Sequence, residues 1–318
     1  MDTVKKKIVV FFPNKIFFGA QITLIPFFFY LKNNIINSCV YVITPVRIHP
    51  FFTKQKLIDG CFNYQGHPWR FFRKKLRQLD PDIIFNLRPS TLPVNLAARL
   101  QCRQVYSFFR WPAVLLGIKT VPETIQYRSN QYLKLLERAG LSRPATALQN
   151  FFHKIAAEAE VTIPDKDYII FMPGGGAGSF KKWQPQKFLQ LQQKILSFNK
   201  NLTFVVILGD AEKKMRSIFK EAVCYINPAV SSIFKLCSGA RLVIANDCGP
   251  SHVAHLLDVK RIILFSNYER DFNEQMANWY LPAAGCRIIV SPYQKERGRQ
   301  LQQIAPERVW QTAREFLN

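Results

Sequence analysis

Short apolar runs separated by helix-like segments constrain the fold of this chain more than any other feature of its sequence. The runs are rich in Val, Ile and Phe and do not alternate with polar residues, which is typical of strands buried on both faces of a parallel sheet. Seven strands are predicted: 8–12, 39–43, 83–87, 168–172, 204–208, 242–245 and 261–265. Strands that alternate with helices predict an α/β protein with parallel sheets.

Helix-like segments fill most of the chain around these runs. The predicted helices are 20–32, 69–77, 93–100, 129–139, 185–198, 211–219, 251–257 and 306–317. The segment 141–165 holds Pro144 and Pro164 and separates two β–α series, so we interpret it as the join between two domains.

The two series predict two Rossmann-like domains whose parallel sheets face each other across a cleft, with ligands beyond the carboxyl ends of the strands. The first domain is expected to span residues 1–150 and the second residues 151–304. The last helix begins at Pro306, and proline is favoured in a first helical turn. We expect the segment 305–318 to pack back on the N-terminal domain.

Positive charge is concentrated in the first half of the chain. The sequence has 44 Lys and Arg and 21 Asp and Glu, a net charge of +23. Residues 1–150 contain 22 basic and 6 acidic residues (+16), and residues 151–318 contain 22 and 15 (+7). Such a field favours an acidic partner: nucleic acid, anionic lipid or an acidic saccharide. RNA binding is the weakest of these, because no RRM, KH or helix-turn-helix signature is present.

Cysteine usage and the apolar start of the chain bear on where the protein works. The seven cysteines are odd in number and no two have CxxC spacing, so a reducing compartment, the cytoplasm, is expected. Apolar residues recur between Ile8 and Leu31, but Pro13, Gln21 and Pro26 interrupt them. A spanning helix needs about 20 consecutive apolar residues, so no membrane anchor or signal peptide is predicted.

A glycine-rich turn follows the predicted strand at 168–172. Glycines let backbone N–H groups approach a ligand closely, and such amides hold phosphate oxygens. The turn contains Gly174, Gly175 and Gly176, and Lys181 or Lys182 after it can neutralise a diphosphate. The Walker and GxGxxG spacings are absent, which argues against a nucleoside triphosphatase. A turn with a purely structural role is the alternative.

Polar residues also follow the predicted strand at 242–245, before a helix opened by Pro250. Polar groups at the carboxyl end of a strand lie where ligands bind, and the N-terminus of the new helix favours a phosphate. Asn246, Asp247 and Gly249 end the strand, and His252 would lie in the first helical turn near a bound phosphate. Asp247 as a simple helix cap is the alternative. In a third stretch, Glu212 is predicted to bind a ribose or base, or else only to favour a helix start.

These three stretches, in this order, resemble the ADP-heptose:lipopolysaccharide heptosyltransferase family of glycosyltransferases. The matching pieces are Pro173-Gly174…Lys181-Lys182-Trp183, Leu208-Gly209…Glu212 and Asn246-Asp247-Cys248-Gly249-Pro250-Ser251-His252. The last piece is the most specific, because the family shows an (N/D)-D-S/T-G-x-x-H run there. Cys248 stands where Ser or Thr is usual, which removes one hydroxyl hydrogen bond. A weaker likeness covers most of the first half.

The resemblance implies the GT-B fold and inverting transfer of a sugar from a nucleotide-sugar donor, expected to be ADP-heptose, to the lipopolysaccharide core. It implies no metal ion and no other cofactor. By position, the turn from Gly174 with Ser179 and Lys181 would grip the donor diphosphate and Glu212 would meet the nucleoside. Asp247, Cys248, Gly249 and His252 would line the donor pocket. The acceptor is expected to be acidic, and no nucleic-acid partner is expected.

One position departs from the family's pattern. The first loop of the family normally reads Gly-Asp, and that Asp is the proposed catalytic base, whereas Ala20 follows Gly19 here. Alanine cannot take a proton from the acceptor hydroxyl. The candidates for a replacement base are Glu123 and His67. A catalytically degenerate protein that binds nucleotide sugars is the alternative.

A basic segment is expected to hold the protein at the cytoplasmic surface of the inner membrane, as a peripheral protein. Its cations are Arg73, Lys74, Lys75 and Arg77. An exposed Trp69 or Phe72 beside them would enter the anionic lipid surface. A solvated helix face without a partner is the alternative.

Overall fold

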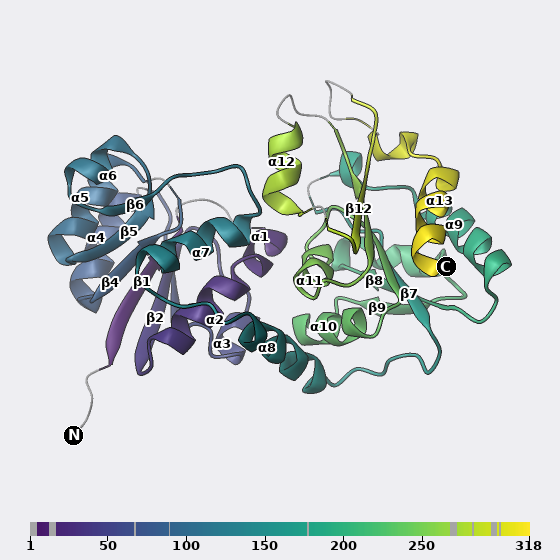
Figure 1. The fold of residues 1–318 in the computed structure, drawn as a ribbon, viewed down its shortest axis with the longest axis horizontal. Coiled ribbons are helices and arrows are strands. Elements are labelled where there is room, and N and C mark those ends of the chain that lie inside the picture. The colour runs from purple at the N-terminus through teal and green to yellow at the C-terminus, as the bar shows by residue number, and fades with distance from the viewer. Residues whose placement is uncertain are drawn as a thin grey trace. The chain divides into compact units, whose positions relative to one another are not determined.

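The computed structural model describes residues 5–12, 17–66, 68–88, 90–176, 178–267, 272–281, 283–293, 298 and 300–318. The chain divides into two compact units, Met1–Leu148 and Gln149–Asn318. Each unit holds a six-stranded, all-parallel sheet with helices packed against it (Figure 1). The predicted class, α/β with parallel sheets in two Rossmann-like domains, is confirmed.

The first unit has the strand order β3-β2-β1-β4-β5-β6. Its strands are β1 (Lys6–Phe11), β2 (Ser38–Thr44), β3 (Gly60–Asn63), β4 (Ile83–Asn86), β5 (Gln104–Phe108) and β6 (Lys119–Val121). Its helices are α1 (Phe18–Ile22), α2 (Ile25–Asn34), α3 (Phe51–Lys54), α4 (Pro68–Leu79), α5 (Leu92–Gln101), α6 (Trp111–Leu115) and α7 (Arg128–Arg138). A further helix, α8 (Ala145–Ala157), contains the boundary between the units.

Two helical layers cover this first sheet. Phe11 of β1 packs against Phe72 of α4, with ring centroids 4.4 Å apart, and one hydrophobic cluster joins residues of α4, α5 and α6 to the sheet. On the other face, Phe85 of β4 meets Phe27 of α2 at 5.5 Å, and α2 packs against α7. Alternate residues along each strand therefore serve opposite cores.

The burial of Phe72 corrects one expectation. Phe72 and Leu76 are fully buried one turn apart, so this side of α4 belongs to the core and Phe72 cannot enter a membrane. Trp69 is half-buried, and the ammonium group of Lys75 lies 4.5 Å from the ring centroid of Phe62. Arg73, Lys74 and Arg77 of this helix are exposed and lie away from its buried side.

The second unit repeats the topology, with the order β12-β11-β10-β7-β8-β9. Its strands are β7 (Tyr168–Met172), β8 (Thr203–Leu208), β9 (Val223–Ile226), β10 (Leu242–Asn246), β11 (Arg261–Phe265) and β12 (Cys286–Val290). Its α-helices are α9 (Pro185–Phe198), α10 (Val230–Ser238), α11 (Ser251–Leu256), α12 (Phe272–Trp279) and α13 (Pro306–Leu317). Three 3₁₀ segments are η1 (Ser179–Lys181), η2 (Asp210–Ser217) and η3 (Gln300–Gln303).

The C-terminal helix differs from its predicted place. Val309, Ala313 and Phe316 of α13 belong to the hydrophobic core of the second unit, and α13 packs against α9, β10 and β11. The apolar residues recur at helical spacing and are covered by that sheet. Segment 305–318 is thus part of the second unit's core, in place of the expected packing on the N-terminal domain.

In each sheet the direction of chain progression reverses between two neighbouring strands. These pairs are β1 with β4 and β7 with β10. The chain leaves such a pair on opposite sides, which opens a crevice at the carboxyl ends of the strands where ligands of doubly wound sheets bind. The glycine-rich turn follows β7, and the Asp247 turn follows β10.

Candidate functional site

Two turns of the second unit meet where β7 and β10 lie side by side. Asn246 ends β10, is buried, and donates from Nδ2 to the carbonyl oxygen of Pro173 at 2.7 Å. Its Oδ1 accepts a hydrogen bond from the backbone N–H of Trp183 at 3.3 Å. One amide side chain thus holds both ends of the glycine-rich turn beside Asp247.

An ion pair joins the two turns directly. The Nζ atom of Lys181 lies 2.7 Å from Oδ2 of Asp247, and both side chains are largely buried. Oδ1 of Asp247 accepts a hydrogen bond from the Tyr280 hydroxyl at 2.9 Å. The following helix has Pro250 as its N-cap and no side-chain cap hydrogen bond, so the capping alternative for Asp247 is wrong.

A second ion pair brings the third predicted stretch to the same place. The Nζ atom of Lys182 lies 2.7 Å from Oε1 of Glu212, which is buried in η2. Two glycines make room for this carboxylate. A Cβ atom added at Gly174 would lie 3.5 Å from Oε2 of Glu212, and one added at Gly209 would lie 2.9 Å from it. Glu212 therefore faces the glycine-rich turn.

The glycines of the turn have different surroundings. A Cβ atom added at Gly175 would lie 2.6 Å from the carbonyl oxygen of Lys181, so the turn closes only around glycine. A Cβ atom added at Gly176 meets no described atom within 4 Å, so this backbone is open to a ligand. Gly178 has a φ of +127°, which favours glycine. The side chain of Ser179 lies outside the described part of the structure.

Burial fixes the protonation of His252 and Cys248. The His252 ring stacks on Tyr280 with centroids 5.0 Å apart. Burial lowers the pKa of His252 to about 4, although Asp247 opposes the shift, so the ring is neutral at pH 7. Burial also raises the pKa of Cys248 to about 12, which keeps its thiol protonated. The backbone carbonyl oxygen of Gly249 accepts a hydrogen bond from the backbone N–H of His252 at 3.2 Å.

Ala20, where the resemblance implies the Asp that acts as catalytic base, lies in α1 of the first unit. His49 is close to this helix. Its backbone N–H donates to Oε1 of Gln21 at 2.8 Å, and the centroid of its ring lies 5.5 Å from that of Phe18. Nδ1 of His49 accepts the backbone N–H of Phe51 at 3.2 Å, so the neutral ring carries its proton on Nε2. His49 is suited to donate a hydrogen bond and is unsuited to act as a base.

Glu123, one of the two predicted replacement bases, lies among cations just after β6. Its Oε1 is 3.4 Å from Nη1 of Arg88 and 3.5 Å from Nη1 of Arg128. The guanidinium of Arg88 lies 6.0 Å from the ring centroid of Phe12, which follows β1. The cluster therefore sits at the carboxyl ends of the first sheet. The other candidate, His67, lies outside the described residues.

Sequence reasoning missed several of these groups. Tyr280, Arg88 and Arg128 belong to no recognisable motif, and each reaches its partner through the fold. Asn246 stands inside a predicted motif, but its buried position inside the sheet was not apparent. A polar residue at the end of an otherwise apolar strand was the available signal.

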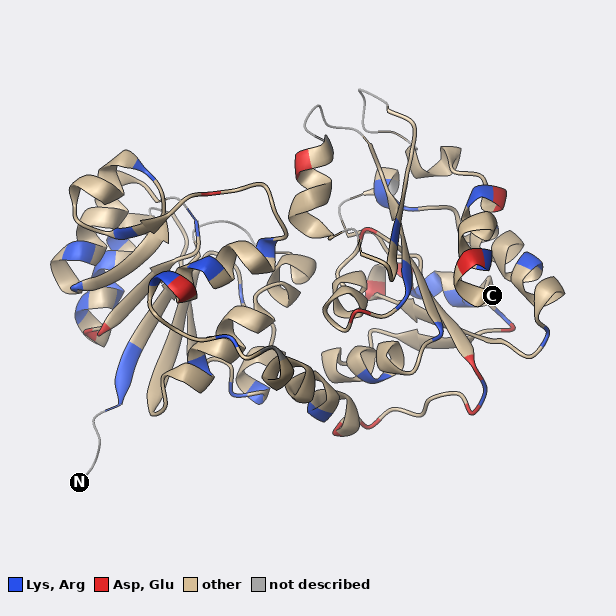
Figure 2. Cartoon of the chain, viewed as in Figure 1, with Lys and Arg blue, Asp and Glu red and all other residues tan. Residues whose placement is uncertain are grey.

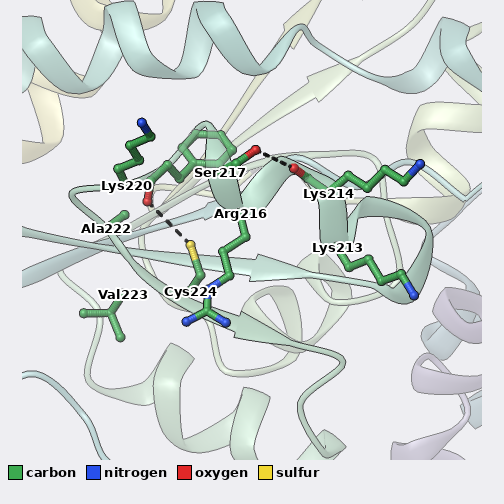
Figure 3. Close-up of a pocket in the computed structure, with 9 residues that line it drawn as sticks. Lys213, Lys214, Arg216, Ser217, Lys220, Ala222, Val223 and Cys224 are labelled. Atoms are coloured by element: carbon green, nitrogen blue, oxygen red, sulfur yellow. Dashed lines mark hydrogen bonds between the residues drawn. The ribbon is translucent and has the colours of Figure 1, made fainter.

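A separate hollow in the second unit carries positive charge. It runs along η2 and the edge strand β9 and has a volume of about 950 Å³ (Figure 3). Its cationic lining residues are Lys213, Lys214, Arg216 and Lys220. Glu212 is buried and turns toward the glycine-rich turn, whereas these four side chains are exposed. The hollow is thus distinct from the paired turns.

Among the described residues, no three His, Cys, Asp or Glu side chains are grouped so as to hold a metal ion. Within the same residues, every helix is too short or too polar to traverse a bilayer.

Comparison with known proteins identifies a family that covers the end of the first unit and most of the second. Residues 131–295 match the family model of glycosyltransferase family 9 (heptosyltransferase). A comparison with curated proteins finds no match.

Solved structures of similar fold cover nearly the whole chain. A glycosyl transferase family 9 protein from Veillonella parvula has a TM-score of 0.65 and 16% identity, covering 100% of this chain and 98% of its own. E. coli heptosyltransferase WaaC with ADP-2-deoxy-2-fluoro heptose has 0.67 and 14%, covering 97% and 99%. E. coli ADP-heptose lps heptosyltransferase II has 0.62 and 14%, covering 98% of each. These two-domain α/β structures confirm the predicted GT-B fold class.

Proposed function

This chain belongs to glycosyltransferase family 9, the family of heptosyltransferases, and we propose that it moves heptose from ADP-heptose onto the lipopolysaccharide core. The observation that carries the proposal is the Lys181–Asp247 ion pair, which joins the turns after β7 and β10. Solved heptosyltransferases of similar fold, one of them with an ADP-heptose analogue, support this choice of donor.

The pocket around Lys181 has the chemistry to bind a nucleoside diphosphate. Lys181 supplies a partly buried ammonium group, and the open backbone at Gly176 supplies amides that a phosphate can approach. Helix α11 has only six residues, so we assign the diphosphate charge mainly to Lys181 and the turn. Glu212, held by Lys182, would accept hydrogen bonds from ribose hydroxyls. Asp247, Cys248, Gly249 and His252 would line the sugar side of this pocket.

Transfer with inversion needs three events at the anomeric carbon. The acceptor hydroxyl attacks from the face opposite the diphosphate, the bond to the diphosphate oxygen breaks, and the hydroxyl proton passes to a base. The leaving group gains negative charge in the transition state, and Lys181 would stabilise that charge. The proposal assigns this stabilisation to protein groups and needs no metal ion.

We assign the base to Glu123 among the described candidates. Its Oε1 faces Arg88 and Arg128, and it stands at the carboxyl ends of the first sheet, as the replaced acid at position 20 would. Two guanidiniums beside it would also orient an acidic acceptor through carboxylate or phosphate groups. The acceptor would be an acidic lipopolysaccharide core at the cytoplasmic surface of the inner membrane.

Donor binding is tested by thermal unfolding with ADP-, UDP- and GDP-sugars, because a ligand that binds only the native state raises the melting temperature. We expect ADP-heptose to stabilise the protein and UDP- and GDP-sugars to leave it unchanged. The Lys181→Ala variant should lose most of the shift, because it lacks the ammonium group that we assign to the diphosphate. Stabilisation by a UDP- or GDP-sugar alone would overturn the choice of donor.

A binding protein without transferase activity is the second candidate, favoured by Ala20 at the position of the family's acid. Turnover by the wild type, by Ala20→Asp and by Glu123→Gln separates the two. If the protein is a transferase that uses Glu123, the wild type should turn over donor and acceptor. The Glu123→Gln variant should then lose at least ~100-fold in kcat, the usual size of general-base catalysis. Activity that appears only in Ala20→Asp would establish the degenerate binder.

A further inference from the structure

We propose that the outer surface of α4, α5 and α6 in the first unit docks the protein on an anionic phospholipid bilayer. We call this surface the docking face; it comprises the exposed residues of the three helices. This inference rests on the proposed function, because a transferase whose acceptor is anchored in a membrane must reach that membrane. Lipid binding itself is measured without donor or acceptor, so the two proposals fail separately.

Leucines form an exposed stripe along α5. Leu92, Leu96 and Leu100 recur every four residues and are exposed, Leu100 by 67%. The opposite side of the helix, including Val94 and Ala98, is buried in the core. A helix of a soluble protein normally turns polar side chains outward, so this stripe calls for an apolar partner.

Helix α6 continues the apolar surface. Trp111 is 69% exposed and Leu115 is 80% exposed, and Val114 between them is also exposed. Phe109, just before the helix, is exposed and contacts Trp111 with ring centroids 6.1 Å apart. Tryptophan is favoured at the boundary between lipid headgroups and acyl chains, where its ring and its N–H are both satisfied.

The stripes belong to one layer of the unit. Residues of α4, α5 and α6 share a single hydrophobic cluster on the same face of the sheet. Helix α5 packs against α4 on one side and α6 on the other, and the three lie together in Figure 1. Their outward sides therefore form one continuous surface.

Cations border the apolar stripes, and acids are missing. Helix α4 turns four exposed cations outward: Arg70, Arg73, Lys74 and Arg77. Figure 2 shows Lys and Arg gathered on this helix. Arg103 and Arg110 flank α5 and α6 and are exposed. The sequence has no Asp or Glu between residues 83 and 122. None of these six cations forms an ion pair with a described residue.

This combination suits a lipid bilayer better than other partners. Leucine side chains cannot form hydrogen bonds or ion pairs with the bases or phosphates of a nucleic acid. A symmetric pair of chains would place one cationic α4 near the other, because such an interface uses the same surface twice. An anionic bilayer meets both needs: acyl chains take the leucines and tryptophan, and lipid phosphates take the cations.

Co-sedimentation with vesicles of phosphatidylcholine, with and without phosphatidylglycerol, tests the proposal. We expect the wild type to bind the mixed vesicles and to bind pure phosphatidylcholine weakly. Each cation near the surface contributes about fivefold to partitioning, so replacing the four on α4 by Gln should weaken binding at least ~100-fold. The triple variant Leu100→Gln/Trp111→Gln/Leu115→Gln should weaken it by at least ~10-fold.

The matched control lies in the second unit. Replacement of its four cations, Lys213, Lys214, Arg216 and Lys220, by Gln removes the same charge from another surface. This variant should keep most of the vesicle binding. Equal losses from both quadruple variants would show unspecific attraction and overturn the docking face.

Two further readouts complete the test. Trp111 fluorescence, identified by its loss in Trp111→Phe, should shift to shorter wavelength on mixed vesicles. All variants should keep the circular dichroism spectrum of the wild type and a cooperative thermal unfolding transition, which shows that they fold. If the triple variant binds vesicles as the wild type does, or only converts a dimer to a monomer in sedimentation, the face is not a membrane surface.

Discussion

At the residue scale, the candidate site depends on side chains that hold each other. Asn246 ties the two turns together, and Asp247 receives both an ammonium group and the Tyr280 hydroxyl. Motif reasoning named Lys181 and Asp247, because their chemistry is visible in the sequence. It did not name Tyr280, because the residue is 33 positions from Asp247 and only tertiary structure joins them.

Replacing Lys181 by Ala should weaken nucleotide-diphosphate binding by about 1.5–3 kcal/mol, the usual contribution of a hydrogen bond to a charged group. Titration calorimetry with ADP measures the loss. Lys214→Ala is the matched control, since Lys214 is an exposed lysine of the same unit that lines the other hollow. If Lys214→Ala loses as much affinity, the diphosphate does not bind at Lys181.

His252 should make the protein less stable in acid. Its pKa falls from 6.5 to about 4 on folding, so the unfolded chain binds the proton more tightly. Stability is therefore complete above pH 6.5 and declines as the pH falls toward 4, by on the order of 3 kcal/mol. Urea unfolding at several pH values measures this decline.

A His252→Gln variant isolates that contribution. Its stability at pH 7 will be lower because the buried ring is lost, but its decline between pH 6.5 and 4 should be smaller than that of the wild type. His255 stays in both proteins, and burial also lowers its pKa, so some decline remains. Equal declines in the two proteins would show that folding does not lower the pKa of His252.

At the element scale, most inner strands were predictable, whereas the edge strands and the inner strand β5 were not. β7, β8, β10 and β11 are almost entirely buried and β1 is buried from Ile8 onward, so they appear in the sequence as unbroken apolar runs. β3, β6, β9 and β12 lie at or near the sheet edges and are partly exposed, and none was predicted. Half-exposed strands of three to five residues carry too little pattern to distinguish them from loops.

Several predicted helix boundaries differ from the observed ones for identifiable physical reasons. The predicted helix at 20–32 is two helices, because the first ends at Ile22 and Pro26 begins another. The predicted join at 141–165 contains α8, which no flanking proline excludes, since Pro144 precedes its first residue. The predicted helix at 211–219 is the 3₁₀ segment η2, which starts at Asp210.

The glycine-rich turn gives a paired prediction. Gly175→Ala should destabilise the protein by about 1–3 kcal/mol, because its Cβ would press on the Lys181 carbonyl. Gly176→Ala should leave stability nearly unchanged, because its Cβ enters open space, and should weaken nucleotide binding if phosphate approaches that backbone. Thermal unfolding with and without ADP measures both. Unchanged ADP affinity in Gly176→Ala would place the phosphates elsewhere.

At the scale of the whole molecule, the two-domain α/β class followed from the alternation of strands and helices. The join was set at 150 and the units divide after Leu148. The placement of the C-terminal helix was not predictable, because the apolar face of Val309, Ala313 and Phe316 would fit either sheet. Pattern reveals that a helix must be covered and does not reveal by which partner.

The uneven charge should make stability depend on salt. A net charge of +23 opposes compaction through self-repulsion, and moderate salt screens it. We therefore expect the melting temperature to rise with sodium chloride at low concentration, and to rise less in the variant that lacks the four outward cations of α4. A melting temperature that falls or stays constant would show that the charges are balanced locally.

The ion pair of Lys181 with Asp247 has a consequence for discrimination among nucleotides. A nucleoside monophosphate would replace Asp247 as the partner of Lys181 by its single phosphate, and such an exchange adds little binding free energy. A pyrophosphate can engage the ammonium group through one phosphate and the turn amides through the other. We therefore expect the proposed pocket to discriminate against nucleoside monophosphates, even when they are abundant.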